Sequence, residues 1–219
     1  CGVLATDAID AALAVTDVFV DFSLPEGFQR HLAACRAHGV PMVVGVTGLD
    51  TAQMQAMAGA AEHIGIVHAA NFSVGVNLAL QLVSLAASVY TDTVDVEIVE
   101  AHHRQKIDAP SGTALALGQR VAQTLGRSLE EEAVYGRQGR TGARKRSTIG
   151  FSTIRGGDVV GEHTVLFLGT GERLEISHRA SDRATFARGA LRAAEWLSGG
   201  MGPGLYGMED VLGFAPAGG

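Results

Sequence analysis

The fold class is decided by residues 17–46, which read DVFVDFSLPEGFQRHLAACRAHGVPMVVGV. Residues 17–22 predict a short buried strand, and the apolar run 41–46 predicts a second one. A helix is predicted between them, because Ser23 and Glu26 have the spacing of a capping box, with Pro25 in the first turn. The expected inner face of this helix and its end comprise Phe28, Leu32, Cys35 and Gly39.

The alternation continues along the chain. Residues 47–50 are expected to turn into a helix that runs through Glu62, and residues 64–69 predict a third strand. Residues 73–90 predict a long, largely apolar helix. Strands that alternate with helices predict a parallel sheet with helical crossovers.

The pattern changes at residue 94, where apolar residues begin to alternate with acidic ones, as in a strand with one wet face. A helix is expected to follow Pro110 and to end near Leu125. Three further β segments are expected at 148–154, 159–168 and 173–180, and a helix at 184–197 precedes a glycine-rich tail. The middle of the chain is thus expected to be α+β, between α/β ends.

Composition excludes several classes of protein. The 219 residues carry a net charge of −6, which gives no support to a nucleic-acid or membrane-surface partner. The basic cluster at 137–146 lacks interleaved aromatic residues and is expected to be a solvated loop. Cys1 and Cys35 are too few for a disulfide framework, and neither a signal peptide nor a membrane span is indicated, so we expect a cytoplasmic protein.

The segment Glu100–Ala114, EAHHRQKIDAPSGTA, predicts a site for an anionic substrate that must be protonated. Histidine exchanges protons near neutral pH, and lysine can hold a carboxylate or supply a proton. His102 is the candidate acid/base. Ser111 is the expected cap of a helix whose first N–H groups, with the Thr113 hydroxyl, would face a carboxylate.

Other readings of the histidines remain open. Adjacent histidines are more often structural than catalytic. A metal site at Glu97, Glu100, His102 and His103 is disfavoured, because neighbouring residues on an extended chain point to opposite sides. The ammonium of Lys106 would also oppose a bound cation. His163 looks catalytic at first, but its alternating apolar neighbours favour a structural or interface role.

Glycines and small residues mark the expected ligand edge of the parallel sheet. The formal GxGxxG at 202–207 follows a helix rather than a strand, so we reject it as a phosphate site. Residues 45–48 and 69–72 instead follow predicted strands, where ligands bind in such sheets. Ordinary strand-to-helix turns remain the alternative for both.

EAHHRQKIDAPSGTALALG, residues 100–118, resembles the signature of the 4-hydroxy-tetrahydrodipicolinate (dihydrodipicolinate) reductase family of bacterial lysine and diaminopimelate synthesis. VDFSLPEGFQRHLAACRAHGVPMVVGVTGLD, AANFSVGVN, GFSTIRGGDVVGEHTVLF, GERLEISHRASDRATFARGA and LYGMEDVLG are also similar to family segments. The resemblance implies reduction of a cyclic dicarboxylate by NADH or NADPH, with His102 as acid/base and Lys106 as proton donor. It implies substrate binding by His103, Ser111, Gly112 and Thr113, cofactor binding by Gly45, Val46, Thr47, Ala69, Ala70, Asn71 and Phe72, and no metal.

The resemblance also implies an architecture. A Rossmann-type α/β cofactor domain would comprise residues 1–73 and 183–219, with an inserted α+β substrate-binding and oligomerisation domain at 74–182 whose mixed sheet builds a homotetramer. Family members carry a first strand, a glycine-rich turn and the residue that selects NAD or NADP before the point that corresponds to Cys1. A chain without them would be expected to bind pyrophosphate poorly, so a catalytically silent dicarboxylate-binding form is the alternative expectation.

Overall fold

The computed structural model describes residues 5–214, which form two compact units. Residues 5–74 and 184–214 make up the first unit, and residues 75–183 make up the second. Within the described residues, no helix is long and apolar enough to cross a bilayer. Cys35 is buried and free, whereas Cys1 lies outside the described residues.

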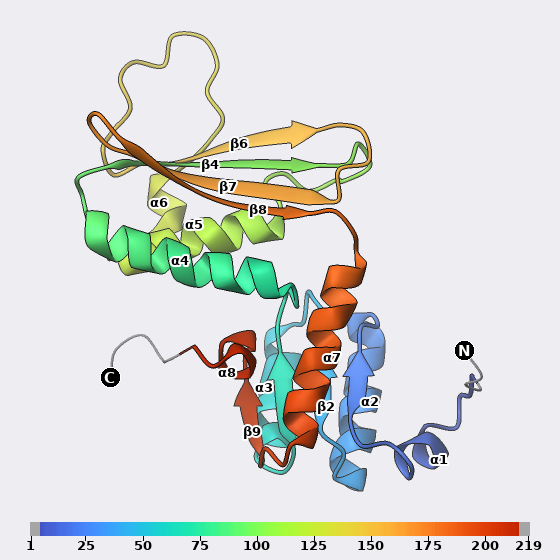
Figure 1. Cartoon of the computed structure of the whole chain (residues 1–219). Helices are drawn as coiled ribbons and strands as arrows, with labels where there is room; N and C mark the ends of the chain where they lie inside the picture. The colour runs from blue at the N-terminus through green and yellow to red at the C-terminus, as the bar shows by residue number, and fades with distance from the viewer. Residues whose placement is uncertain (1–4, 215–219) are drawn as a thin grey trace. The chain divides into compact units, whose positions relative to one another are not determined.

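The first unit is built on a four-stranded parallel sheet in the order β1-β2-β3-β9. Its strands are β1 (Phe19–Asp21), β2 (Met42–Val44), β3 (Gly65–His68) and β9 (Gly204–Tyr206). The helices are α1 (Ile9–Leu13), α2 (Pro25–His38), α3 (Thr51–Ala61), α7 (Ala184–Ser198) and α8 (Met208–Leu212). The predicted parallel sheet is confirmed, and Figure 1 shows its strands alternating with helices.

Two apolar cores lie on opposite faces of this sheet, because successive residues of a strand point to opposite sides. Met42 and Val44 pack with the inner faces of α2 and α3, whereas Val43 packs with α7 and α8. Phe28, Leu32 and Cys35 are buried as predicted. Gly39 ends α2 in the left-handed conformation, with φ of 66°.

The predicted capping box of α2 is wrong. The residue before the helix is Leu24, which is extended with ψ of 158°, and no side chain caps the first turn. Proline disfavours the helical conformation in the residue that precedes it, so Pro25 makes itself the first helical residue. The Ser23 N–H is instead bound by the Asp21 carboxylate at 2.9 Å.

The second unit contains a mixed five-stranded sheet in the order β5-β6-β4-β7-β8, which confirms the expected α+β character. Its strands are β4 (Asp95–His102), β5 (Ala133–Tyr135), β6 (Ile149–Arg155), β7 (Gly161–Leu168) and β8 (Arg173–Ala180). The central strand β4 runs parallel to β6 and antiparallel to β7. The helices are α4 (Val74–Tyr90), α5 (Gly112–Thr124) and the short α6 (Leu129–Glu132).

The helices α4 and α5 cover one face of this sheet (Figure 1). The covered core includes Val96 and Ile98 of β4, together with Ala114, Leu117 and Val121 of α5. Residues on the other face alternate with these, and in β4 they are partly exposed. The strand with one wet face is therefore confirmed.

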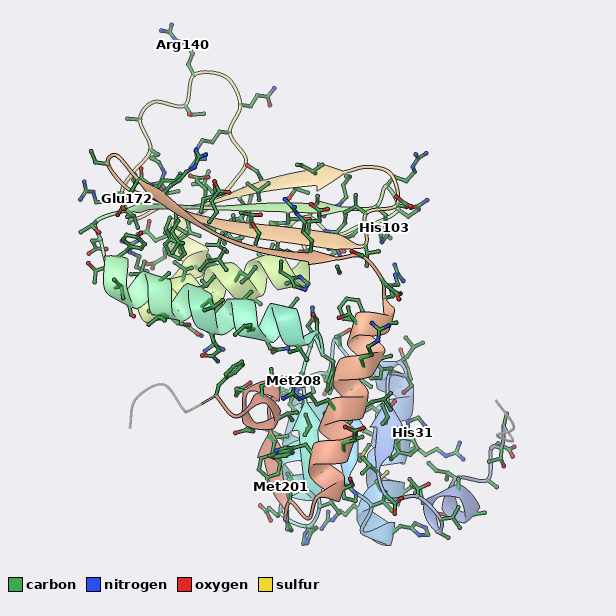
Figure 2. The ribbon with its side chains drawn as sticks, viewed as in Figure 1. His31, His103, Arg140, Glu172, Met201 and Met208 are labelled. Carbon is green, nitrogen blue, oxygen red and sulfur yellow. The ribbon has the colours of Figure 1, made fainter. Side chains whose placement is uncertain are left out.

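The basic loop between β5 and β6 is only partly the solvated loop expected. Arg137 makes two hydrogen bonds to Glu97 on the wet face of β4, at 2.8 and 3.0 Å. Arg144 binds Asp95 and, at 3.2 Å, Glu97. Arg140 extends from the tip of the loop (Figure 2). The expectation missed the ion pairs of Arg137 and Arg144, because their acidic partners come from a strand 40 or more residues earlier.

Five short elements were not predicted, namely α1, α6, β5, β9 and α8. The strand β9 lies in the segment expected to be a glycine-rich tail, and it completes the parallel sheet beside β3. These segments are too short to show a period of 2 or 3.6, and they lack the longer apolar runs that predicted the equally short β1 and β2.

Candidate active site

The second unit brings the end of β4 next to the beginning of α5. Glu100 and His102 lie on the covered face of β4, where Glu100 is 1% exposed and His102 8% exposed. Ser111 precedes α5, and its hydroxyl accepts a hydrogen bond of 3.1 Å from the Ala114 N–H. The predicted cap is therefore confirmed, and the cap and the two β4 residues belong to one cluster.

Glu100 is the centre of this cluster. Its carboxylate accepts two hydrogen bonds of 2.8 Å from the Arg155 guanidinium, one of 2.6 Å from His102 Nδ1 and one of 3.1 Å from the Ser111 N–H. Burial raises the pKa of the Glu100 carboxyl, but these hydrogen bonds together outweigh burial and leave its pKa below the ordinary value. Glu100 is therefore a buried, ionised acceptor.

His102 is consequently held in one orientation. Because an ionised carboxylate can only accept, Nδ1 of His102 carries the proton of that hydrogen bond, and Nε2 is left for other chemistry. Burial lowers the pKa of His102, with Lys106 and Arg155 adding to this effect, while the carboxylate of Glu100 opposes it. A Cβ atom at Gly161 would lie only 3.0 Å from Nε2, so the absence of a side chain there leaves space beside this nitrogen.

His163 lies two residues after Gly161 on the same face of β7, and its ring is next to that of His102. The two rings are in an edge-to-face arrangement with centroids 5.0 Å apart. Ser111 Oγ and His163 Nε2 are 2.9 Å apart. Burial, and next the nearby His102, lower the pKa of His163 to about 4, so the ring is neutral at physiological pH. The residue expected to have a structural or interface role is thus in contact with the candidate acid.

His103 and Lys106 have different partners from His102. His103 Nε2 lies 3.3 Å from the Arg183 guanidinium, and Figure 2 shows His103 at the end of the sheet. The Lys106 ammonium lies 2.8 Å from the carboxylate of the exposed Asp108. This hydrogen bond lowers the pKa of Asp108. The two adjacent histidines therefore have different partners, as predicted from the opposite directions of neighbouring side chains on an extended chain.

Gly112 and Thr113 form the first turn of α5. They directly follow Ser111, the N-cap residue, and Gly112 is exposed whereas Thr113 is partly buried. Helix N-termini attract anions, because their N–H groups point outward and the helix dipole is positive there. The structure thus places the Ser111–Thr113 turn, His102 and Lys106 within one unit.

The predicted cofactor residues follow two neighbouring strands of the first unit. Gly45, Val46 and Thr47 follow β2, and the segment 69–72 follows β3. Because Val44 and His68 are register partners in these parallel strands, both segments lie at the carboxyl end of the sheet. Ligands bind at this end in parallel α/β sheets.

These residues offer different groups to a ligand. Val46 and Phe72 are each 1% exposed, so their side chains belong to the core, whereas Thr47 and Ala70 are exposed. The Asn71 carboxamide oxygen accepts a hydrogen bond of 2.8 Å from the Ser73 N–H. A nicotinamide ring would thus meet mainly backbone and small side chains here, which suits a flat group that approaches closely.

Arg155, Gly161 and the role of Glu100 were missed in the sequence. Glu100 was considered only as a metal ligand. The alternation in β4 carries a usable signal, because it places Glu100 and His102 on the same face as the apolar Val96 and Ile98. Within residues 5–214, no group of three or more His, Cys, Asp or Glu side chains is arranged to hold a metal ion.

Comparisons with known proteins match both parts of the chain to the same family. The family profile described as dihydrodipicolinate reductase, N-terminus, matches residues 1–72, and the profile described as dihydrodipicolinate reductase, C-terminus, matches residues 75–212. A 4-hydroxy-tetrahydrodipicolinate reductase of Alkalilimnicola ehrlichii is 61% identical over 212 residues, which are 97% of this chain and 79% of the relative. Its counterpart in Pseudomonas fluorescens (strain Pf0-1) is 62% identical over 197 residues, 90% of this chain and 73% of the relative.

A solved structure is similar over both units. Dipicolinate-bound dihydrodipicolinate reductase from Paenisporosarcina sp. TG-14 matches with a TM-score of 0.73 and 29% identity, covering 91% of this chain and 76% of that chain.

Proposed function

The chain belongs to the dihydrodipicolinate reductase family, and we propose from this premise that it reduces 4-hydroxy-tetrahydrodipicolinate to tetrahydrodipicolinate with NADH or NADPH. The reaction is a step of diaminopimelate and lysine biosynthesis. In the balanced reaction, hydride and a proton enter while the hydroxyl group leaves as water. The chain must therefore hold a dianionic ring and place a proton donor beside it.

His103, Ser111, Gly112 and Thr113 bind the substrate carboxylates in this proposal. The helix N-terminus supplies N–H donors and a favourable dipole, and the Lys106 ammonium adds a positive charge. The binding of dipicolinate, a planar dicarboxylate, by the Paenisporosarcina reductase supports this assignment.

His102 and Lys106 supply the proton in this proposal. His102 Nδ1 is bound to Glu100, so Nε2 is the nitrogen that exchanges the proton, on the side left open by Gly161. A positioned acid of this kind contributes roughly 10²–10⁴-fold to the rate. The observation that carries the proposal is the buried His102, held by Glu100 beside a capped helix N-terminus.

The first unit holds the cofactor in this proposal, at Gly45, Val46, Thr47 and residues 69–72. NADH or NADPH would supply the hydride. The residues fit this group, because the exposed turn positions are small and two parallel strands end side by side. The domain boundaries proposed are 1–73 with 183–219 for cofactor binding, and 74–182 for substrate binding and assembly.

The test is turnover of 4-hydroxy-tetrahydrodipicolinate, followed by the loss of NADH or NADPH absorbance. His102→Gln and Lys106→Cys should lower kcat by orders of magnitude, while titration with NADH or NADPH shows nearly unchanged affinity. Pyridine-2,6-dicarboxylate, a substrate mimic, should bind the unmodified chain and compete with the substrate. Near-normal turnover of either variant removes that residue from the mechanism, and no turnover by the unmodified chain refutes the activity. No observation on the described residues favours the catalytically silent alternative.

The proposed homotetramer forms through the uncovered face of the second unit's sheet. This face presents Val99, Ile154 and Leu166 among charged residues, and Ile154 is 55% exposed. Pairing of sheets between copies would cover it. Light scattering should give four times the chain mass of 22.7 kDa, and Leu166→Lys should reduce that mass. A monomer at micromolar concentration would contradict the tetramer. The cytoplasmic location stays a prediction.

A further inference from the structure

The Glu100 carboxylate connects two parts of the proposed site. It binds the imidazole of His102 and the backbone N–H of Ser111, which lies 11 residues later at the start of α5. A single buried side chain thus sets the position of the proposed acid relative to the turn proposed to hold the substrate carboxylates.

Arg155 clamps this carboxylate in place. Its two terminal nitrogens each lie 2.8 Å from one Glu100 oxygen, in the two-point geometry that fixes the plane of a carboxylate. The guanidinium also donates to the Asp108 carbonyl oxygen at 2.6 Å, on the loop that carries Lys106. Arg155 is the last residue of β6, the strand parallel to β4, and it is the register partner of His102.

Stability alone is a weak explanation for this arrangement. Moving a carboxylate and a guanidinium out of water is costly, and apolar residues of similar volume commonly replace buried ion pairs without loss of stability. The covered face of β4 is otherwise apolar at Val96 and Ile98. If apolar residues replaced Glu100 and Arg155, the N–H at Nδ1 of His102 would lose its hydrogen-bond acceptor.

We propose that Glu100, held by Arg155, is a positioning residue of the reductase: it fixes the His102 imidazole with the proton on Nδ1 and Nε2 toward the substrate, and it ties this acid to the Ser111 turn. The inference rests on the function proposed above and deepens it. Glu100 does not touch the substrate, because it is 1% exposed and its oxygens are occupied by Arg155, His102 and Ser111.

Glu100 also adjusts the charge of His102. The charged or titratable groups around this imidazole are Glu100 on β4, Lys106 on the following loop, Arg155 on β6 and His163 on β7. Among the named influences on His102, only Glu100 favours the imidazolium, whereas burial, Lys106 and Arg155 oppose it. Removing the negative charge should therefore make His102 a weaker base and shift its titration to lower pH.

The decisive variant is Glu100→Gln, which keeps the shape of the side chain and removes its charge. Its matched control is Glu97→Gln, the same change on the opposite face of the same strand, at a carboxylate that also binds guanidinium groups. Three quantities are compared in both variants and the unmodified chain: kcat and KM against pH, the affinity for NADPH, and the titration of ¹³C-labelled His102. The His102 signal is assigned by its loss in His102→Gln.

The expected result for Glu100→Gln is a fall in kcat of at least about 10-fold, within the roughly 10²–10⁴-fold that proton transfer contributes. KM should change less than kcat, NADPH affinity should be unchanged, and both the alkaline limb of kcat and the His102 titration should move to lower pH. Glu97→Gln should match the unmodified chain in all of these. Size exclusion is run on both variants to check that each keeps the assembly of the unmodified chain, because Glu97 lies on the uncovered face of the sheet beside Leu166. An unchanged kcat profile together with an unchanged His102 titration in Glu100→Gln overturns the proposal.

A second variant covers the case in which Glu100→Gln does not fold. Glu100→Gln combined with Arg155→Gln removes both charges, so no guanidinium is left unpaired. The same loss of kcat is expected, with a smaller titration shift in the same direction, because Arg155 itself opposes the imidazolium. The two proposals also fail differently. If the unmodified chain has no turnover, the reductase activity fails, yet the His102 titration still tests the positioning role.

Discussion

The hydroxyl oxygen of Ser111 and Nε2 of His163 lie 2.9 Å apart in the interior of the second unit, although 52 residues separate them in the chain. The same hydroxyl accepts the Ala114 N–H and so caps α5. Ser111 therefore connects the start of the helix to β7, and His163 in turn contacts the His102 ring. One small side chain has both a local and a long-range role.

Ser111→Ala should consequently destabilise the second unit. Loss of the cap costs about 0.5–2 kcal/mol. The buried His163 nitrogen left without its partner adds about 1–3 kcal/mol. The measurement is urea unfolding, compared with Ser128→Ala. Ser128 also precedes a helix but makes no side-chain cap hydrogen bond, so its substitution should change the free energy of unfolding little. Equal effects of the two substitutions would contradict this account.

His163 should make the fold sensitive to acid. Its folded pKa, about 4, is below the ordinary histidine pKa of 6.5, so the unfolded chain binds more protons between these values. The contribution of neutral His163 to the free energy of unfolding is fully present above about pH 6.5. Between pH 6.5 and about 4 it falls with decreasing pH, by about 1.4 kcal/mol per pH unit for one such group. His163→Gln should show a shallower decline in thermal unfolding midpoints over this window. Parallel pH profiles for the two proteins would refute the prediction.

Gly189→Ala should severely disturb the first unit. A Cβ atom at Gly189 on α7 would lie 1.7 Å from the carbonyl oxygen of Phe72, which belongs to the proposed cofactor segment. Backbone cannot move aside as a side chain can, so we expect a loss at or above the roughly 1–3 kcal/mol typical of overpacking, and weaker NADPH binding. The control is Gly59→Ala on α3, where the Cβ meets nothing within 4 Å. That change should stabilise the helix by about 0.5–1 kcal/mol. Calorimetry and NADPH titration distinguish the two outcomes.

Asp108→Asn should lower KM for the dicarboxylate. The Lys106 ammonium is 2.8 Å from Asp108, whose side chain is 58% exposed, and a substrate carboxylate would compete for the same ammonium. Removing the competing charge should improve substrate binding, while an exposed pair of this kind contributes little to stability, about 0–1 kcal/mol. Steady-state kinetics at constant ionic strength check this. A raised KM would show instead that Asp108 holds Lys106 in its working position.

Most of the helices and strands could be predicted because their signals are local. The alternation of β4, the buried faces of α2 and α5 and the Ser111 cap are each set by residues within one or two turns or strand repeats. The capping box of α2 failed for a local reason as well, since the effect of Pro25 on Leu24 outweighed the spacing of Ser23 and Glu26.

By itself, the sequence determined the class of each unit, the position of the Glu100–Ala114 segment at the end of a strand and the beginning of a helix, and the candidate acid His102. Only the tertiary structure decided that Arg155 and His163 surround that acid, that Gly161 leaves room beside Nε2, and that Arg137 and Arg144 bind the wet face of β4. The physical reason is that periodicity reports which face of an element is buried, whereas partners about 40 to 60 residues apart in the chain are chosen by strand order and register.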